Sequence, residues 1–329
     1  VADIWHAYSE LLIKTLNVHT IDWLTDSPFG ALALSLMQKG YAFDYISDAQ
    51  ILNTKFKDSL LQTEGASYKT IVVPPTQHMP LSTLNHLLDL AASGATIIMH
   101  QTLPKDVPGM FELEQRREKL QNSISGLQFE SIDGKMLRAN IGSGKILLAN
   151  NLQTALQSAK VNREEIVDYG VKFIRRGHDD GLHYFFVNHS DRKIDRWITL
   201  GENCRSAVIL DPLKADRAGI AATRQNEGKT EIYVQLESGE SCIVRTFANR
   251  IATGKQWRYL ESSKPIFPIT GVWDVEFVDG GPELPSSFTS ESLGSWTGRG
   301  DNQADRFAGT ARYSISFEMP DTPADDWLL

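Results

Sequence analysis

The chain has 329 residues, of which 41% are hydrophobic and 22% charged, and its formal net charge is −8. This length predicts two or three domains, and the composition is that of a globular protein with a buried core. The negative charge argues against a nucleic-acid partner, because phosphate binding needs clustered Lys and Arg. No run reaches the roughly 18 apolar residues that span a bilayer, so no membrane partner is expected either.

The start of the chain and its cysteines leave the cellular compartment open. Residues 1–8 have neither the basic start nor the small-residue cleavage site of a signal peptide. The first residue is Val1 rather than Met, so we expect that the natural start was removed or lies upstream. Cys204 and Cys242 form no metal or redox motif, and the sequence does not decide whether they pair.

The first 160 residues alternate short β-branched runs with amphipathic helices. Pro28 follows the possible caps Asp26 and Ser27, and Gly40 ends the helix that starts there. Strand–helix alternation at this spacing predicts an α/β domain, with a mostly parallel sheet and helices on both faces. The expected strands are residues 1–8, 41–46, 70–73, 95–99 and 146–149, and the expected helices are 29–38, a short one capped by Ser47 and Asp48, 81–92, 111–120 and 152–159.

After Val161 the helical pattern stops, and short strands separated by turn residues follow. Ile232, Val234 and Leu236 alternate with polar or aromatic neighbours, which is typical of a strand with one buried face. Such strands predict a small antiparallel β-sandwich over residues 161–250. They are expected at 173–176, 183–188, 194–199, 207–210, 231–236 and 242–247.

The last part of the chain has too few strands for a complete domain. A polar linker is expected at residues 249–263, followed by strands at 271–277 and 310–317. Two or three strands do not close a core unaided, and the apolar Trp327-Leu328-Leu329 enters what looks like a further strand. We therefore predict an incomplete β-sandwich over residues 262–329, and interpret the chain as an internal piece of a larger protein.

Two motifs suggest ligand sites but are better explained as turns. Gly-Ser-Gly-Lys at 142–145 suggests a phosphate loop, yet such a loop follows a strand and opens a helix, whereas these glycines precede a strand. His178, His183 and the two aspartates between them offer metal-type ligands. However, Asp-Gly between two strand patterns is the chemistry of a tight hairpin. We predict hairpins at both places and no metal site.

The α/β half suggests an amidotransferase-like unit, whose chemistry needs a cysteine nucleophile at a strand-to-helix elbow. The elbows after Val73 and Met99 carry Pro74-Pro75 and His100-Gln101, and neither cysteine lies in this half. A glycosidase would need two carboxylates facing one cleft. The sequence nominates no such pair among its 41 acidic residues. Catalytic residues are therefore unknown.

Large aromatic side chains are candidates for stacking on sugar rings, although in strands they belong to the core more often. On that ground Trp273 is assigned to the core. Trp296 lies in a Gly-rich loop and is the candidate sugar-binding residue. The adjacent Glu164 and Glu165 are interpreted as solvated charges that diverge on a turn or helix end.

Seven strings follow one another along most of the chain. They are Gly-Tyr-Ala-Phe-Asp-Tyr-Ile-Ser-Asp at 40–48, Tyr-Lys-Thr-Ile-Val-Val-Pro-Pro at 68–75, Asp-Val-Pro-Gly at 106–109, Arg-Glu-Glu-Ile-Val-Asp at 163–168, Phe-Ile-Arg-Arg at 173–176, Phe-Val-Asn-His-Ser at 186–190 and Gln-Leu-Glu-Ser-Gly-Glu-Ser-Cys at 235–242. This ordered set resembles large bacterial α-L-rhamnosidases of glycoside hydrolase family 106. Residues 271–277 and 307–313 resemble the start of the galactose-binding-like sandwich of family 2 glycosidases.

The resemblance implies a fold and an activity for the parent protein. Residues 1–160 would be an amidotransferase-like, Rossmann-like unit without its nucleophile, and the family's catalytic carboxylates lie in a (β/α)8 barrel that precedes it. No catalytic residue is therefore carried over. The family cleaves terminal rhamnose with inversion, assisted by bound calcium. This implies rhamnose-containing glycans as partners and a secreted or periplasmic location, whereas this chain itself is expected to hold no cofactor.

The leading hypothesis is that the chain is the post-catalytic region of a rhamnosidase-like hydrolase. It would scaffold the barrel, contribute to sugar binding and be catalytically silent alone, so its partners would include the missing portions of its own polypeptide. Two alternatives stay open. One is a stand-alone carbohydrate-binding module that uses Trp296, and the other is a hydrolase with its site between the α/β half and the first sandwich.

Overall fold

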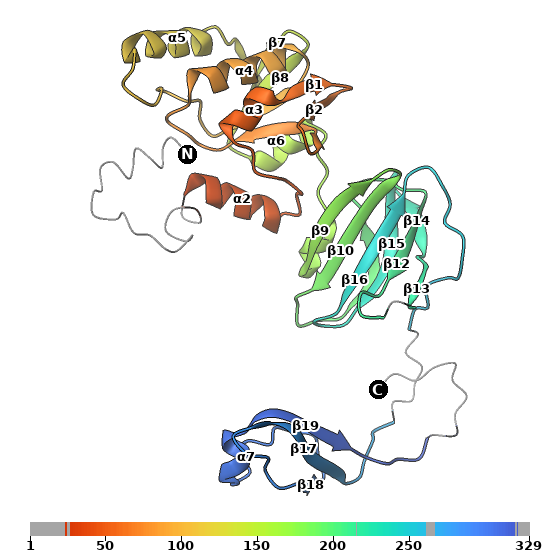
Figure 1. The fold of residues 1–329 in the computed structure, drawn as a ribbon. Coiled ribbons are helices and arrows are strands. Elements are labelled where there is room, and N and C mark those ends of the chain that lie inside the picture. Colours follow the sequence, from red (N-terminus) through yellow and green to blue (C-terminus); the bar gives the residue numbers. More distant parts are fainter. Residues whose placement is uncertain (1–23, 25–26, 215, 261–266, 320, 322–329) are drawn as a thin grey trace. The chain divides into compact units, whose positions relative to one another are not determined.

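A computed structural model of the chain describes residues 24, 27–214, 216–260, 267–319 and 321. The chain divides into two compact units, Val1–Tyr259 and Leu260–Leu329 (Figure 1). The strand expected at residues 1–8 and the strand expected to begin at Trp327 lie outside the described residues. No described helix is long and apolar enough to cross a membrane.

The first part of unit 1 is built on a five-stranded sheet with the order β4-β5-β8-β7-β6. The strands β4, β5 and β8 are parallel, whereas β8, β7 and β6 are antiparallel. The sheet is thus mixed rather than mostly parallel, because the chain returns through two hairpins, of which the sequence pattern revealed only the one at residues 142–145. The strands are β4 (Thr70–Val73), β5 (Thr96–His100), β6 (Phe129–Ile132), β7 (Met136–Ile141) and β8 (Gly144–Ala149).

Helices cover both faces of this sheet, as predicted (Figure 1). On one face, Ile97 and Met99 pack with α4 (Leu81–Ala92) and α5 (Leu113–Ser125). On the other, Ile98 packs with α2 (Pro28–Gln38) and α6 (Leu152–Ser158). Burial on both faces explains why these central strands are continuous apolar runs.

The helix starts follow the local signals in the sequence. Ser27 caps α2, its Oγ accepting from the Gly30 N–H at 3.0 Å, with Pro28 in the first turn. Ser47 and Gln50 form a capping box at the start of α3 (Asp48–Asn53). A small antiparallel sheet of β1 (Lys55–Lys57), β2 (Leu60–Gln62) and β3 (Ser67–Tyr68) follows α3.

The hairpin predicted at residues 142–145 is confirmed. Gly142 has φ +53 and joins β7 to β8. A Cβ on Gly142 would lie 2.3 Å from the Ala92 carbonyl oxygen, and one on Gly144 would lie 2.3 Å from those of Ala91 and Ala95. The two glycines therefore allow the turn to pack against the end of α4.

The prediction of a strand at residues 41–46 is wrong. The segment is extended, but no backbone hydrogen bond joins residues 42–46 to any strand among the described residues. Its side chains nevertheless alternate, with Tyr41 and Phe43 packing against the α2 and α6 side and Ile46 against the α4 side. The periodicity of a buried strand is present, but none of the described strands is its hydrogen-bonding partner.

The second part of unit 1 consists of two antiparallel sheets that share one core, so all six strands expected between residues 161 and 250 are confirmed. The sheet orders are β13-β12-β16-β10-β9 and β11-β15-β14, and the short helix η2 (Glu165–Tyr169) precedes them. The strands are β9 (Val171–His178), β10 (Gly181–Asn188), β11 (Ile194–Thr199), β12 (Ser206–Leu210), β13 (Ala218–Ile220), β14 (Thr223–Asn226), β15 (Lys229–Leu236) and β16 (Ser241–Phe247).

Part of the expected polar linker packs on these sheets instead. Trp257 donates its backbone N–H to the Ile220 carbonyl at 2.9 Å. The Tyr259 hydroxyl accepts from the Ala222 N–H and donates to the Tyr233 carbonyl, both at 3.0 Å. These aromatic residues explain why the compact unit extends to Tyr259.

The described residues of unit 2 form a three-stranded antiparallel sheet, with the order β18-β17-β19, and a short helix. Its small core consists of Phe277, Ala304 and Phe307, with Phe288, Trp296 and Ala311 packed against it. The elements are β17 (Trp273–Gly281), β18 (Phe288–Ser290), α7 (Asn302–Arg306) and β19 (Ala308–Ser314).

Candidate functional site

The carboxyl ends of β5 and β8 border a pocket of about 580 Å³. In open α/β sheets, ligands bind beyond the carboxyl ends of the strands. The polar groups here are the amides of Gln101, Asn150, Asn151 and Gln153, the hydroxyl of Ser35, the imidazole of His100 and the ammonium of Lys39. No carboxylate lines this pocket among the described residues. The set can exchange hydrogen bonds with hydroxyl groups, but it lacks an acid–base pair of carboxylates.

Gln101 occupies the elbow at which an amidotransferase-like unit would carry its nucleophile. Its φ of +66 is unusual for a residue with a side chain, and its N–H donates to the Ala149 carbonyl at 3.0 Å. An amide side chain cannot act as a nucleophile in the way a thiolate does. The turn after β5 therefore carries no nucleophilic side chain at Gln101, and a loop rather than a helix follows it until Leu113.

The two cysteines are free and buried in the core of the sandwich, so they do not pair. Burial raises the pKa of the Cys204 thiol to about 11 and that of Cys242 to about 12. Both side chains are kept in the protonated, unreactive form.

The hairpin predicted at Asp180-Gly181 is confirmed between β9 and β10. His178 Nε2 lies 3.0 Å from the Thr246 carbonyl, and its Nδ1 accepts from the Asp180 N–H at 3.2 Å. Both ring nitrogens of His178 are thus occupied by the backbone. Burial lowers the pKa of His183, whose ring lies tilted against that of His178 with centroids 4.6 Å apart. These histidines pack together as structural groups.

Calcium takes six to eight oxygen ligands. Within the described part of the chain, no three His, Cys, Asp or Glu side chains gather into a group that could hold a metal ion. The resemblance implies calcium for the parent protein, and the described residues of this chain contain no group of this kind to hold it.

Glu164 is buried, which corrects its interpretation as a solvated charge. Its carboxylate accepts from Arg175 Nη1 at 2.6 Å, the Tyr184 hydroxyl at 3.1 Å and the Gly201 N–H at 2.8 Å. Burial raises the pKa of Glu164, and the Arg175 guanidinium opposes that rise. Its backbone N–H donates to the Gly40 carbonyl at 2.8 Å, so the same residue joins the α/β part to the sandwich. The sequence carries no periodic signal for such a residue.

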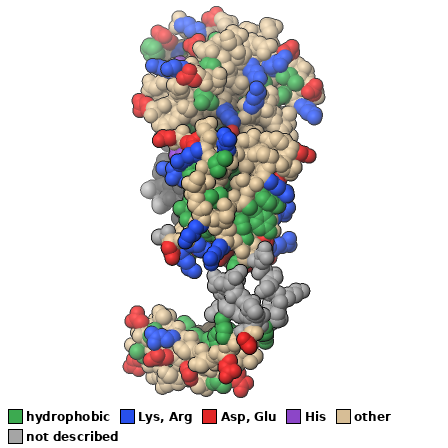
Figure 2. All heavy atoms as spheres, turned by 90° about the vertical axis from the view of Figure 1, so that its right-hand side faces the viewer, with side chains coloured by type: hydrophobic (Ala, Val, Ile, Leu, Met, Phe, Trp, Pro, Cys, Tyr) green, Lys and Arg blue, Asp and Glu red, His purple; other side chains and the backbone are tan. Residues whose placement is uncertain are grey.

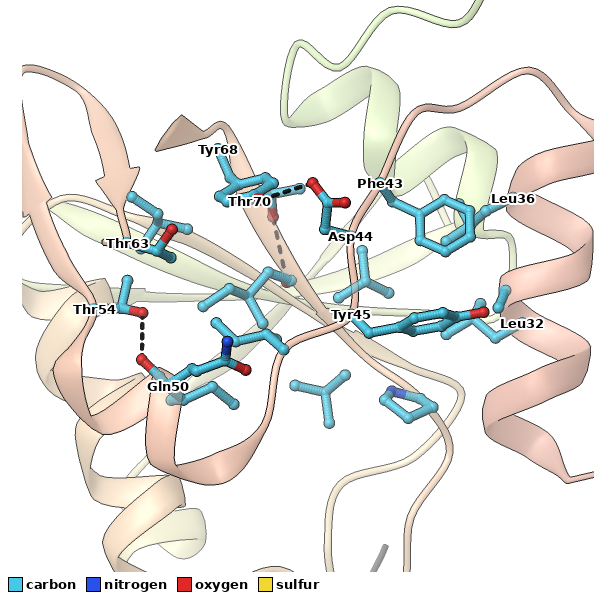
Figure 3. A pocket seen from close by; sticks show the side chains of 18 of the residues that line it. Leu32, Leu36, Phe43, Asp44, Tyr45, Gln50, Thr54, Thr63, Tyr68 and Thr70 are labelled. Carbon is cyan, nitrogen blue, oxygen red and sulfur yellow. Dashed lines mark hydrogen bonds between the residues drawn. The ribbon is translucent and has the colours of Figure 1, made fainter. Parts of the chain in front are cut away.

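A second, larger groove of about 680 Å³ lies along β4 and the extended residues 41–46 (Figure 3). Three carboxylates line it, and each is already hydrogen-bonded. Asp44 accepts from the Tyr68 hydroxyl at 2.7 Å, Asp48 from the Thr83 hydroxyl at 2.8 Å, and Glu202 from Lys69 Nζ at 2.7 Å. Burial, aided by Asp44, raises the pKa of Tyr68 to about 12. The groove is otherwise mainly apolar.

Trp296, the candidate sugar-binding residue, is half-buried in unit 2. Its ring packs edge-on against Phe277, with centroids 5.8 Å apart, and its Nε1 is buried without a hydrogen-bond partner. Part of the ring therefore belongs to the small core, and its contact with sugar stays a prediction.

On the face that Figure 2 shows, Lys and Arg side chains are scattered among Asp and Glu rather than gathered into one large patch. Charges of both signs also meet in ion pairs, such as Lys193–Glu237 at 2.9 Å and Lys229–Glu165 at 3.0 Å. Mixed charge of this kind is typical of an ordinary solvated surface.

Comparison with known proteins identifies similar chains. The sequence model of the α-L-rhamnosidase family, glycoside hydrolase family 106, matches residues 27–212. Among solved structures, a rhamnosidase from Novosphingobium sp. PP1Y aligns with 87% of this chain at 21% identity and a TM-score of 0.64. The chain spans only 27% of that rhamnosidase. No curated protein matches.

A β-galactosidase from Bacillus circulans sp. alkalophilus is a more distant structural match. It aligns with 67% of this chain and 37% of its own, at 11% identity and a TM-score of 0.42.

Proposed function

Because this chain belongs to the α-L-rhamnosidase family, glycoside hydrolase family 106, we propose that it is a non-catalytic scaffold region of a larger glycoside hydrolase. Its α/β part would be an amidotransferase-like, Rossmann-like unit without a nucleophile, and unit 2 would be the opening of a galactose-binding-like sandwich. The parent protein would act on rhamnose-containing glycans.

The proposal rests on where the carboxylates lie and on the hydrogen bonds that they already accept. Hydrolysis with inversion needs two carboxyl groups about 6.5–9.5 Å apart, one to protonate the leaving group and one to activate water. None of the described residues of the smaller pocket is a carboxylate, and the carboxylates of the larger groove accept hydrogen bonds from Tyr68, Thr83 and Lys69. Glu164, which has the raised pKa of a candidate acid, is enclosed by Arg175 and Tyr184. These arrangements support structural roles.

An assay on p-nitrophenyl α-L-rhamnopyranoside tests catalytic silence. We expect no release of nitrophenol above the rate in buffer. Turnover that Glu202→Gln or Asp44→Asn abolishes, while the exposed Glu118→Gln leaves it intact, would instead establish the alternative of a hydrolase with its site beside the first sandwich.

The amides at the carboxyl ends of β5 and β8 favour a second role in sugar binding. Gln101 and Asn150 are exposed and border a pocket with no charged acid, which suits a neutral polyol. We propose that this pocket contacts a glycan of the parent's substrate. Calorimetric titration with L-rhamnose should then give binding that Gln101→Ala and Asn150→Ala weaken at least about tenfold, a loss of about 1.4 kcal/mol.

The same titration distinguishes sugar binding in this pocket from the alternative of a carbohydrate-binding module that uses Trp296. Trp296→Ala should remove binding only if unit 2 holds the sugar. Gln115→Ala, an exposed change on α5, is the matched control for both variants. If none of the variants alters the titration, neither sugar site exists as proposed.

A further inference from the structure

The outer face of the five-stranded sheet in the sandwich is apolar where a solvated face would be polar. β9, β10 and β16 lie side by side in this sheet (Figure 1). Their inward side chains fill the shared core, and the residues between them point outward. Four outward residues stand opposite one another in one row across the strands, namely Ile174, Phe185, Ile243 and Leu210. Ile174 is 65% exposed and Phe185 is 37% exposed. This apolar row spans three strand spacings, or about 14 Å.

The three-stranded sheet of the same sandwich shows the usual pattern of a solvated face. Its outward residues include Asp195, Tyr233 and Gln235, and the Tyr233 hydroxyl donates to Asp195 Oδ1 at 2.6 Å. Antiparallel sheets with one solvated face alternate apolar and polar side chains. The three-stranded sheet follows this rule and the five-stranded sheet departs from it. Folding of the sandwich therefore does not explain the apolar row.

A row of basic residues runs beside the apolar row. Arg176, His183 and Arg245 stand opposite one another on β9, β10 and β16. Like charges directly opposite on neighbouring strands are destabilising. Burial lowers the pKa of His183, and the positive charges of His178 and Arg245 lower it further. Arg245 Nε is buried without a hydrogen-bond partner within the described part of the chain. This basic row thus has a donor that the sheet leaves unused.

The strands themselves supply no negative charge to balance the row. None of the residues of β9, β10, β12, β13 and β16 is Asp or Glu, although the whole chain has a formal net charge of −8. Lys172 lies on the other side of the apolar row, two residues before Ile174 on β9. The outer face is therefore apolar along its middle and basic on both sides. Carboxylates from a partner would match this charge.

We propose that the outer face of the five-stranded sheet docks a protein surface that is apolar at its centre and carries carboxylates beside it. Ile174 and Phe185 would pack on the apolar centre, while Arg176 and Arg245 would bind the carboxylates. This deepens the scaffold role proposed above, because a scaffold needs a surface on which another folded part is held.

The charge of the outer face also argues against two other occupants. Two copies of the chain that met through this face would bring basic residues together without a carboxylate from either strand set. A lipid surface takes up apolar side chains that protrude into it, whereas Ile243 and Leu210 are partly buried within the sheet. Both occupants are outcomes that the experiment below identifies.

Binding of an acidic, apolar probe to the intact 329-residue chain tests the proposal. The probe is a labelled peptide of about three Glu-Leu-Ala-Ala-Leu-Glu-Lys heptads, whose helix presents a Leu seam with Glu on both sides. One control peptide exchanges Glu and Lys, and another has Ser in place of Leu. We expect saturable binding of the probe in fluorescence anisotropy, weakened by added salt, and no binding of either control.

Variants of the chain assign the binding to this face. Ile174→Ser and the double change Arg176→Gln with Arg245→Gln should each weaken the probe at least about tenfold. Phe111→Ser, at a residue that is 79% exposed on the loop before α5, is the apolar control. Arg192→Gln, whose side chain is 88% exposed, is the basic control. Neither control should change the affinity.

Stability of the chain alone separates docking from a structural role of the basic row. Because the row sets like charges opposite one another, Arg176→Gln should leave the urea midpoint unchanged or raise it. A midpoint that falls would mean that Arg176 serves the fold, and would overturn its assignment to a partner.

Four further results would overturn the proposal. Absence of probe binding, or equal binding of the Lys-flanked peptide, would show that the face does not select an acidic surface. Dimers in sedimentation that Ile174→Ser dissociates would make a second copy the occupant. Binding to phosphatidylserine vesicles that Ile174→Ser removes would make it a lipid surface. An unchanged affinity in the Ile174 and arginine variants would place the probe elsewhere. Neither the rhamnoside assay nor the sugar titration affects these readouts, so this proposal and the proposed function fail independently.

Discussion

Glu164 is a carboxylate with three hydrogen-bond donors around it and only 1% of its side chain exposed. Glu164→Ala would leave the Arg175 guanidinium, itself 18% exposed, without its counter-charge. Removing one partner of a buried pair costs about 3–5 kcal/mol. We therefore expect the free energy of unfolding, measured by urea denaturation, to fall by about that amount.

The neighbouring Glu165 provides the control for this prediction. It pairs with Lys229 at 3.0 Å, but the two side chains are 37% and 56% exposed. Exposed pairs contribute about 0–1 kcal/mol, so Glu165→Ala should change little. Equal losses from Glu164→Ala and Glu165→Ala would contradict the buried role of Glu164.

The cysteines give a second prediction for single residues. With pKa values of about 11 and about 12, Cys204 and Cys242 would be thiolates in at most about one molecule in a thousand at pH 8, against roughly one in four for an unperturbed thiol. We expect their alkylation by iodoacetamide to be at least 100-fold slower than that of a free thiol of about pKa 8.5. Mass spectrometry of the folded chain measures this, and 6 M guanidinium should restore both rates.

Among the elements, the hairpin between β7 and β8 depends on a glycine for space. A Cβ at Gly144 would lie 2.3 Å from two backbone oxygens, those of Ala91 and Ala95, which cannot move as a side chain can. Overpacking of this kind costs about 1–3 kcal/mol, so Gly144→Ala should lower the unfolding free energy by that amount. Gly65→Ala is the matched control, since nothing lies within 4 Å of its added Cβ. A neutral Gly144→Ala would show that the hairpin can move away from α4.

The loop before α5 is held by an ion pair whose effect depends on pH. Asp106 accepts from Arg117 Nε at 2.8 Å and Nη2 at 2.7 Å, and chiefly this interaction lowers the pKa of Asp106 to about 2. A carboxyl group whose pKa is lowered by folding stabilises the protein above its unfolded value of 3.8, and that contribution is lost as the pH falls toward 2.

Asp106→Asn should therefore lower the melting temperature at pH 7 and have a vanishing effect near pH 2. Thermal unfolding at pH 7, 4 and 2.5 measures the difference. In a double-mutant cycle, Arg117→Ala should remove most of the effect of Asp106→Asn at pH 7. A difference that stays constant over this range would assign the loss to packing rather than to charge.

At the scale of the whole molecule, the sequence predicts those features that depend on neighbouring residues, such as helix starts and strand alternation. Ser27, Pro28 and Ser47 place helix starts, and the alternation in residues 231–236 places β15, because caps and periodicity act within a few residues. The segment 41–46 has the same periodicity as a strand, so only the three-dimensional structure could show that none of the described strands pairs with it. Glu164 was missed for a related reason, since its donors come from residues 175, 184 and 201.

The extent of unit 1 leads to the last prediction. Trp257 and Tyr259 pack against the sandwich core, and Arg217 Cζ lies 4.9 Å from the centre of the Trp257 ring. Partial burial of two aromatic side chains is worth roughly 2–4 kcal/mol. A chain ending at Arg250 should therefore unfold at lower urea concentration than one ending at Leu260, although both lack the strands and helix of unit 2. Trp257→Ala in the longer chain should reproduce part of the loss, whereas Arg258→Ala, an exposed change between the two aromatics, should not. Equal midpoints for the two truncated chains would show that residues 251–260 add nothing to the sandwich and act as a plain linker.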